Sequence, residues 1–252
     1  MVRLKVVHVI TRLDLGGAQQ NTLHTVRSLD STRFEAILVC GEGGTLDAEV
    51  RREAGLMTLF FHSLVREISP LRDLRALLEL RGFFASERPD IVHTHSSKAG
   101  ILGRLAAAMT GVPVIVHTYH GFGFHDRQNA VVKTLYVLLE RLCALVTTRL
   151  IFVSHANQGY AVRHRIRGAA RGIVIRSGIR LRDFPAKVDA VALKTSAGIG
   201  MHRPVVVSIG NLKPQKNVGD FLTAAALVAE RVPEAHFVFL GGGPQRRQLE
   251  AK

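Results

Sequence analysis

The chain has 252 residues, 47% of them hydrophobic, which is enough to bury one large core or two smaller ones. Its formal net charge of +14 favours anionic partners. No apolar run approaches the roughly 20 residues of a membrane span, and the opening MVRLKVVHVIT predicts a first strand rather than a signal peptide. Cys40 and Cys143 have no CxxC partner, so we expect buried thiols in a reducing compartment rather than a disulfide framework.

Apolar runs alternate along the chain with amphipathic stretches. The predicted strands are Leu4–Ile10, Phe34–Val39, Met57–Phe61, Asp90–His93, Val114–His117, Leu150–Val153, Gly172–Ile175, Val205–Ile209 and His236–Leu240. The predicted helices are Ala18–Leu29, Leu46–Ala54, Leu71–Ala85, Ser97–Met109, Asn129–Leu145, His155–Val162 and Val218–Arg231. In the third helix we expect one stripe to face the core, formed by Leu71, Leu74, Leu77, Leu78 and Phe84. This alternation predicts an α/β fold with a doubly wound parallel sheet.

The same pattern predicts two domains. Residues 1–184 hold seven strands and form a complete Rossmann-like domain, and residues 185–203, with Pro185 and the stretch AGIGMHRP, form a linker. Residues 204–252 contain strand, helix, strand and the beginning of another helix, which cannot bury their own faces. We therefore expect the second Rossmann-like domain to be incomplete and the chain to be a fragment or a truncated product.

Ligands bind at the carboxyl ends of the strands in open α/β sheets, so the residues there are the candidates for a site. Gly16 and Gly17 precede the first helix, where paired glycines allow close backbone approach and positive φ. They predict either a contact with a phosphate or sugar, or an ordinary turn. Ser154 follows the strand-like LIFV and is expected to cap the next helix, since no GxSxG elbow is present.

Histidines follow two neighbouring predicted strands, in HTHSSKAG and HTYHGFGFH. His93 and His95 are two apart on a strand and are expected to share a face. We further expect His95, His117, His120 and His125 to gather at the strand ends, as a general base, hydrogen-bond donors to a sugar, or metal ligands. Because no Cys, Asp or Glu stands among them, we expect no metal.

The segment Val205–Asn217, VVVSIGNLKPQKN, predicts a strand, a tight loop and a helix that begins at Val218. Lys213 and Lys216 then lie where free backbone N–H groups and the helix dipole favour a phosphate. The later FVFLGGGP is a second strand that ends in glycines, but Arg246 stands where GxGxxG requires its third glycine. This departure, with the lack of a Walker motif, disfavours dinucleotide oxidoreductases and P-loop proteins.

Arginines are concentrated without any acid in the block from Arg163 to Arg182. Such a block attracts lipid headgroups, nucleic acid or phosphorylated substrates, or is a solvated face without a partner. Its members are Arg163, Arg165, Arg167, Arg171, Arg176, Arg180 and Arg182.

Taken in this order, these segments resemble the retaining glycosyltransferases of family 4, which have the GT-B fold. The matching segments are GGAQ at 16–19, DIVHTHSSKAGILGRLAA at 90–107, VIVHTYHGFGF at 114–124, LIFVSHANQGY at 150–160, VVVSIGNLKPQKN at 205–217 and FVFLGGGPQRRQLE at 237–250. The resemblance covers nearly the whole chain, and it rests on the combination of motifs rather than on any one of them.

The resemblance implies a role for each matching residue. His120 corresponds to the catalytic histidine near the transferred sugar, and Lys216 to the lysine that contacts the donor diphosphate. Asn211 stands where the family usually has an arginine, so Lys213 is expected to supply the second charge. Gly16 and Gly17 are implied to approach the donor phosphates or the acceptor. The implied sugar or acceptor cleft includes His95, Gly121, His125 and Ser154, and the implied nucleotide loop is Gly241, Gly242 and Gly243.

The implied function is transfer of a sugar from a nucleotide-sugar donor to a hydroxyl acceptor with retention, without a metal or other cofactor. We expect a lipid-linked or glycan acceptor, in cell-surface polysaccharide or glycolipid synthesis. The expected location is cytoplasmic, peripheral at the inner face of the plasma membrane, with Arg163–Arg182 toward anionic lipid. A downstream pair of glutamates found in the family would follow the last residue here, so we expect impaired or no activity from this chain alone.

Two other functions stay open on the sequence. A GT-B nucleotide-sugar 2-epimerase would need carboxylates for proton transfer, and the loop candidates are Asp14, Glu42 and Asp126. A basic module that binds nucleic acid would need aromatic residues among its basic ones. The arginine block has only Tyr160 and Phe184 at its edges, so no nucleic acid is expected.

Overall fold

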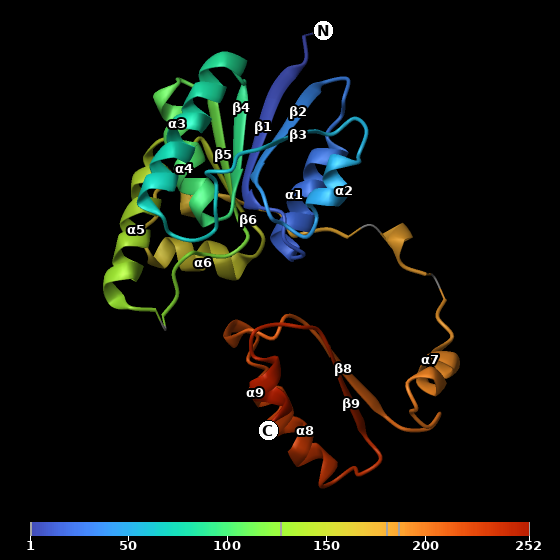
Figure 1. The fold of residues 1–252 in the computed structure, drawn as a ribbon. Coiled ribbons are helices and arrows are strands. Elements are labelled where there is room, and N and C mark those ends of the chain that lie inside the picture. Colours follow the sequence, from blue (N-terminus) through green and yellow to red (C-terminus); the bar gives the residue numbers. More distant parts are fainter. Residues whose placement is uncertain (1, 127, 180, 186, 252) are drawn as a thin grey trace. The chain divides into compact units, whose positions relative to one another are not determined.

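The computed structural model describes residues 2–126, 128–179, 181–185 and 187–251, with the backbone alone for Arg182 and Gln215. The chain divides into two compact units, Met1–Ile179 and Arg180–Lys252. Figure 1 shows the fold of each unit. Each is described here by itself.

The first unit is built on a seven-stranded parallel sheet in the order β3-β2-β1-β4-β5-β6-β7. Its strands are β1 (Leu4–Arg12), β2 (Phe34–Gly41), β3 (Met57–Phe60), β4 (Ile91–His95), β5 (Val114–Tyr119), β6 (Arg149–Phe152) and β7 (Ile173–Val174). The strand order runs outward in both directions from β1, so the chain switches direction between β1 and β4. This confirms the predicted doubly wound α/β sheet, and such a switch point is where these sheets place their ligands.

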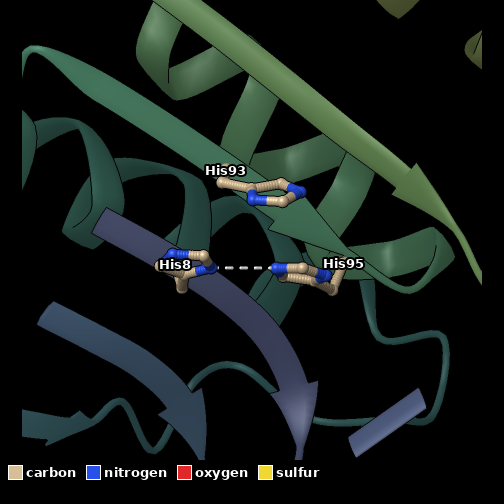
Figure 2. A group of neighbouring side chains, drawn as sticks. All are labelled: His8, His93 and His95. Atoms are coloured by element: carbon tan, nitrogen blue, oxygen red, sulfur yellow. Dashed lines mark hydrogen bonds between the residues drawn. The ribbon is translucent and has the colours of Figure 1, made fainter. Parts of the chain in front are cut away.

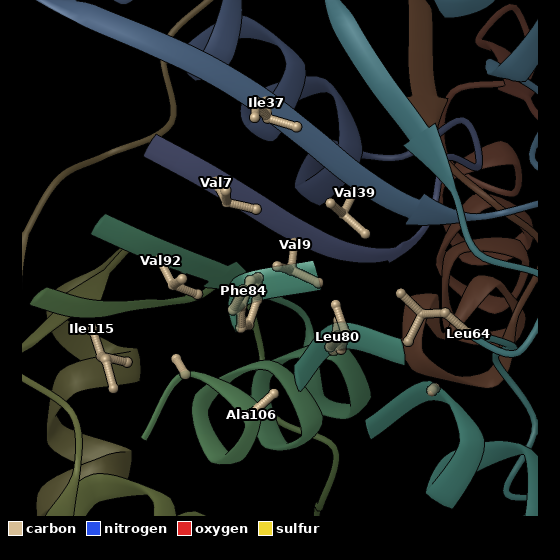
Figure 3. Packing of buried hydrophobic residues seen from close by; sticks show 13 residues of the cluster. Val7, Val9, Ile37, Val39, Leu64, Leu80, Phe84, Val92, Ala106 and Ile115 are labelled. Carbon is tan, nitrogen blue, oxygen red and sulfur yellow. The ribbon is translucent and has the colours of Figure 1, made fainter. Parts of the chain in front are cut away.

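Helices connect the strands and cover both faces of the sheet, as Figure 1 shows. They are α1 (Gly17–Ser28), α2 (Asp47–Arg51), α3 (Pro70–Glu87), α4 (Ser97–Met109), α5 (Ala130–Leu145), α6 (His155–Arg163) and the 3₁₀ turn η1 (Ala169–Arg171). Side chains alternate between the two faces along each strand. Val7 and Val9 of β1 therefore pack in the cluster with α3 and α4 (Figure 3), while Ile10 packs in the cluster with α1 and α2.

The buried face of α3 differs from the predicted leucine stripe. Leu71 is 84% exposed, and Leu74 and Leu78 are also exposed. Two members of the stripe do face the core, since Phe84 is buried and Leu77 packs beside it, together with Ala76, Leu80 and Phe83, which the stripe did not include. A small side chain such as Ala76 permits the close approach of two helices, and α4 presents Ala99, Ala106 and Ala107 to the same cluster. The predicted stripe is therefore right for Leu77 and Phe84 and wrong for Leu71, Leu74 and Leu78.

A buried polar group ties α4 and α5 to β5. Arg104 of α4 is fully buried and donates from Nη2 to Oε2 of Glu140 at 2.7 Å. The hydroxyl of Tyr119 donates to the same carboxylate oxygen at 2.6 Å. The predicted thiols are confirmed, since Cys40 and Cys143 are free and buried, and burial raises the pKa of Cys143 to about 11.

The second unit contains a two-stranded parallel sheet of β8 (Val205–Ile209) and β9 (His236–Leu240), with the bounds that the sequence predicted. The other elements are η2 (Leu181–Asp183), α7 (Ala190–Ser196), η3 (Pro214–Lys216), α8 (Val218–Ala229) and α9 (Arg246–Glu250). The helix α7 lies within residues 185–203, which the sequence predicted as a linker. Ile209 and Leu240, at the ends of the two strands, are exposed.

Among the described residues, no helix combines the length and the apolar character that crossing a bilayer requires.

Candidate functional site

Three histidines meet on one face of the sheet at the switch between β1 and β4. His8 of β1 is paired in register with His93 of β4, and His95 follows two residues later on the same face. The ring centroids of His93 and His95 lie 4.2 Å apart, and those of His8 and His93 lie 4.9 Å apart. Figure 2 shows the three rings turned toward one another. The prediction that His93 and His95 share a face is confirmed.

Two hydrogen bonds join three of these rings into a row that reaches the carboxyl end of β5. Nδ1 of His8 lies 3.1 Å from Nε2 of His95, and Nδ1 of His95 lies 3.1 Å from Nε2 of His120. We call His8, His95 and His120 the histidine chain. His93 stands beside it, with Nε2 2.7 Å from Oγ1 of Thr118. His8 and His95 are each only 1% exposed, whereas His120 is partly exposed just beyond the strand.

Burial keeps these imidazoles neutral. It lowers the pKa of His8 and of His120 to about 4, and the pKa of His93 and His95 falls well below the ordinary value from burial and from the neighbouring imidazoles. A neutral imidazole carries one proton, so one of its nitrogens donates and the other accepts. At neutral pH the rings can therefore form hydrogen bonds with one another without mutual repulsion.

Two of the predicted histidines do not join this group. His117 is paired in register with Thr94, one position away from His95, and so points to the opposite face of the sheet. There its Nδ1 lies 2.9 Å from Oγ1 of Thr94, and its ring packs where a Cβ on Gly100 would stand. His125 is exposed in the loop after β5, and the described ring contacts of the histidine chain do not include it. The expectation that all four gather is wrong for His117.

The nitrogens of His8, His93 and His95 lie within 4.8 Å of one another, and these residues form a group with the residue types that hold a metal. Tetrahedral zinc with bonds of about 2.0–2.1 Å needs ligand nitrogens about 3.3 Å apart. A metal here would replace the hydrogen bond between His8 and His95 and would draw His93 inward. The 3.1 Å between Nδ1 of His8 and Nε2 of His95 suits a hydrogen bond and is also close to this ligand spacing, so the expectation of no metal stays a prediction.

The loop after β5 is held by aromatic packing. The ring of Phe122 stacks on Tyr119 with 4.8 Å between centroids, and Phe124 is buried. Gly123 is required because a Cβ there would come within 2.8 Å of Ser97 at the start of α4. Gly121 is exposed and has open space where its Cβ would stand. His120 thus lies between a fixed strand and a fixed loop.

The loop between β1 and α1 is shaped differently from the prediction. Gly16 has a φ of −169°, which is extended, and Gly17 begins the helix, so neither uses the positive φ that glycine allows. A Cβ on Gly17 would meet nothing within 4 Å. Gly17 therefore leaves open space at the first turn of a 12-residue helix, the kind of end that accepts an anion.

Ser96 and Thr11 are site residues that the sequence analysis missed. Ser96 follows His95 directly and has a φ of 61°, an uncommon conformation for a residue other than glycine. Its Oγ lies 2.8 Å from Oγ1 of Thr11 at the end of β1, and the same Thr11 oxygen accepts from the backbone N–H of Ala99. The end of β1 is thereby fixed to the start of α4. Ser154 caps α6 as predicted, accepting from the N–H of Asn157 at 3.1 Å.

In the second unit the structure brings the two predicted loops together. Gly210 donates to the carbonyl of Leu240 at 3.0 Å, and Leu212 donates to the carbonyl of Gly242 at 3.0 Å. The loop with Asn211, Lys213 and Lys216 therefore lies beside Gly241–Gly243, at the carboxyl ends of β8 and β9. A Cβ on Gly241 would fall 1.8 Å from the carbonyl oxygen of Gly210, and one on Gly243 would fall 2.6 Å from that of Leu212. Close backbone contact explains both glycines.

The lysines of this loop stand near the start of α8. Lys216 is exposed and its side chain passes Gly210, about 3.8 Å from where a Cβ would stand. Asn217, with a φ of 47°, then turns the chain into the 12-residue helix α8. Lys213 is partly exposed at the start of η3. Two lysines and a helix N-terminus thus belong to the loop at one end of this small sheet.

Comparison with known proteins defines the class of this chain. The glycosyl transferase 4-like domain matches residues 16–178, and the glycosyl transferases group 1 domain matches residues 192–252. The chain belongs to the glycosyl transferase 4-like family. It is 34% identical over 251 residues to the UDP-Gal:α-D-GlcNAc-diphosphoundecaprenol α-1,3-galactosyltransferase of Escherichia coli. That match covers 98% of this chain and 64% of the relative.

Solved structures agree on the fold. Sucrose-phosphate synthase from Thermosynechococcus elongatus matches 99% of this chain and 67% of its own, with a TM-score of 0.78 and 15% identity. UDP-N-acetylglucosamine 2-epimerase from Rickettsia bellii matches 98% of this chain and 64% of its own, with a TM-score of 0.62 and 12% identity. Together with the family matches, these likenesses confirm the predicted GT-B-type α/β fold.

The buried histidines predict that the first unit loses stability in acid. Because the pKa of His8 is about 4 in the fold and about 6.5 when unfolded, the unfolded chain binds more protons between these values. The resulting loss of unfolding free energy is absent above pH 7, grows as the pH falls through 6.5, and is complete below about 4. At pH 4.5 this loss amounts to roughly 2.5 kcal/mol for His8 alone.

Urea unfolding at pH 7 and at pH 4.5 measures this effect. Replacement of His8 by glutamine, which cannot be protonated, should reduce the loss of unfolding free energy between the two pH values by that amount. The matched control is His62→Gln, because the side chain of His62 is 83% exposed. Equal losses in wild type and His8→Gln would contradict the assignment.

Proposed function

We propose that this chain transfers a sugar from a nucleotide-sugar donor to a hydroxyl acceptor with retention of anomeric configuration. The observation that carries the proposal is the meeting of the Asn211–Lys216 loop with Gly241–Gly243 at the carboxyl ends of β8 and β9, in a chain of the glycosyl transferase 4-like family. The name of the E. coli relative specifies a UDP-sugar donor and a lipid diphosphate acceptor, which supports a nucleotide sugar and a lipid-linked or glycan acceptor here. Cell-surface polysaccharide or glycolipid synthesis is the matching process.

The proposed donor site is the lysine-bearing loop of the second unit. Sugar transfer builds negative charge on the departing diphosphate, and fixed positive groups stabilise that charge in the transition state. Lys216 and Lys213 would supply ammonium groups, with Asn211 as a neutral donor and the N-terminus of α8 as a partial positive charge. Since these groups suffice to balance a diphosphate, we propose transfer without a metal or other cofactor. Gly242, free of close contacts, would allow the nucleotide to approach the backbone.

The proposed role of the first unit is to hold the sugar and the acceptor. His120 is the partly exposed end of the histidine chain and is neutral at pH 7, so it would orient a hydroxyl by hydrogen bonding rather than attack carbon. Gly16 and Gly17 would let a phosphate or sugar approach α1. Gly121, His125 and Ser154 stand at or beyond the ends of β5 and β6. His95 is buried behind His120, so it would act through that ring.

The 2-epimerase alternative is disfavoured by the state of its candidate carboxylates. Asp14 receives two hydrogen bonds of 3.0 Å from Arg12. Glu42 is paired with Arg51 at 2.8 Å, and Asp126 with Lys133 at 2.7 Å. The hydrogen bond with Lys133 lowers the pKa of Asp126, which makes that carboxylate a poor proton acceptor, while Asp14 and Glu42 are each engaged by an arginine. The fold alone, which epimerases share, does not favour that chemistry.

We also propose a peripheral, cytoplasmic location with α6 and η1 facing an anionic membrane. In the described part of the block, Arg163, Arg165, Arg167, Arg171 and Arg176 are all exposed; Arg180 and the side chain of Arg182 lie outside it. The neighbouring helix α5 carries an exposed apolar row of Val131, Leu135, Leu138, Leu142 and Leu145. Arg141 of α5 donates to the carbonyl of His164 at 2.9 Å, which joins the apolar and basic surfaces.

Nucleic acid is not a proposed partner. Single strands bind where bases stack on free aromatic rings among basic residues. Tyr160, the aromatic residue beside the arginines of α6, has its ring packed against Phe122, Phe124 and His164. It therefore offers little surface to a base.

Replacement of Lys216 by alanine should weaken binding of UDP-galactose, measured by calorimetry, about tenfold or more. A hydrogen bond to a charged group contributes about 1.5–3 kcal/mol, and 1.4 kcal/mol corresponds to a factor of ten. The matched control is Lys187→Ala, an exposed lysine outside the loop. Equal affinities of wild type and Lys216→Ala would contradict the proposed donor site.

The double charge reversal Arg167→Glu with Arg171→Glu should reduce co-sedimentation with phosphatidylglycerol vesicles at least tenfold, since each basic residue near an anionic surface contributes about 1 kcal/mol. Arg231→Glu with Arg247→Glu makes the same charge change at exposed sites in the second unit and should have a smaller effect. Equal sedimentation of the wild type with phosphatidylglycerol and with uncharged phosphatidylcholine would overturn the surface role.

A further inference from the structure

The inner end of the histidine chain has a feature that the proposed transfer reaction leaves unexplained. Nε2 of His8 is buried and has no hydrogen-bond partner in the described structure. His8 stands in the middle of β1, within the apolar run VVHVI, where valine or isoleucine would pack without any polar atom. A polar ring in such a place needs a reason beyond packing, because burying it costs free energy unless its hydrogen bonds are used.

We propose that His8 and His95 are positioning residues that hold His120 in one tautomer, with the proton on Nδ1 and the lone pair of Nε2 turned inward to His95. The role of this tautomer in sugar transfer rests on the proposed function. The assignment of the tautomer does not depend on that function.

The hydrogen bonds couple the three rings. Each N···N contact needs a proton on one nitrogen and a lone pair on the other, and each neutral ring has one proton. Two arrangements therefore keep both bonds. In the first, His8, His95 and His120 all carry the proton on Nδ1; in the second, all three carry it on Nε2. Any mixed arrangement breaks at least one of the two 3.1 Å contacts.

The buried Nε2 of His8 selects between these arrangements. The second arrangement places an N–H at Nε2, where the described structure offers no acceptor. The first places a lone pair there instead. Buried N–H groups without a partner are rarer in proteins than acceptors whose lone pairs are incompletely used, and an unmet buried donor costs about 1–3 kcal/mol. The first arrangement is favoured, and the choice made at His8 is passed through His95 to His120.

The consequence appears at the exposed end of the chain. With Nε2 of His120 engaged by His95, its Nδ1–H is the remaining polar group, and no hydrogen bond to that nitrogen forms within the described part of the chain. His120 therefore presents a donor of fixed identity at the carboxyl end of β5. Such a donor can bind a sugar hydroxyl oxygen but cannot remove its proton. The fold would thus make His120 a binding group rather than a general base.

Long-range ¹H–¹⁵N spectra of the ¹⁵N-labelled chain at pH 7 test this directly, because the two imidazole nitrogens have different shifts when protonated and unprotonated. We expect His8, His95 and His120 all to show protonated Nδ1 and unprotonated Nε2, a tautomer that free histidine populates less. His95→Phe should release His120 to the mixture seen for free histidine, with Nε2–H in the majority. His8→Gln, whose amide can still donate to His95, should keep Nδ1–H on His120.

The matched control is His125→Phe, which replaces an exposed histidine in the same loop and should leave the three signals unchanged. A wild-type spectrum with Nε2–H on His120 would overturn the proposal, and this result needs no variant to fold. An unchanged His120 in a folded His95→Phe would refute the coupling. Failure of the sugar-transfer proposal would appear separately, as absent UDP-sugar binding with the tautomers intact.

Discussion

The pairing of β1 with β4 is the contact on which the candidate site of the first unit depends. It joins segments more than 80 residues apart, and it lies where the sheet changes direction. Its register places His8 beside His93 and brings Thr11 to Ser96. At the other end of the same strands, the backbone N–H of Lys5 donates to Asp90 at 2.7 Å. A slip of one residue would move every one of these side chains to the opposite face.

The pairing of β1 with β4 buries imidazole rings within a sheet whose other buried side chains are mostly apolar. On one face Val7, Val9 and Val92 belong to the largest buried cluster, while on the other the imidazoles use one another as hydrogen-bond partners. These imidazoles can be buried at low cost in free energy because they are neutral, whereas a buried charge would require a counter-ion. The sheet meets that requirement elsewhere, where Arg104 is paired with Glu140 and Tyr119. Of the hydrogen-bonded imidazoles, His120 is the one that lies at the carboxyl end of its strand.

The sequence predicted the elements and the lysine loop well, because these depend on local patterns. The bounds of β8 and β9 were found from two β-branched or aromatic runs that end in glycine. His93 and His95 were placed on one face by their spacing alone. His117 was misplaced because its face depends on the register between β4 and β5, which no local pattern contains. His8 was missed for a related reason, although the one polar residue in VVHVI was a visible signal.

Other predictions were wrong because they assigned one structural role to a residue type wherever it occurred. Leucines on α3 were expected inside, but alanine at the contact with α4 decides which face is buried. Paired glycines before α1 suggested positive φ, whereas the backbone there is extended or helical. Gly241 and Gly243 contact the backbone of the neighbouring loop, and their place in a nucleotide loop stays a prediction. Local sequence patterns identified the candidate residues, and tertiary packing determined which of these residues contact one another.

The most direct test of the account is a transfer reaction with a labelled nucleotide sugar and a lipid-linked acceptor, followed by analysis of the anomeric centre in the product. The account predicts that the sugar in any labelled lipid-linked product keeps the configuration that it had in the donor, whatever the yield from this chain alone. A product of inverted configuration, or a nucleotide sugar epimerised at C2 without transfer, would contradict it.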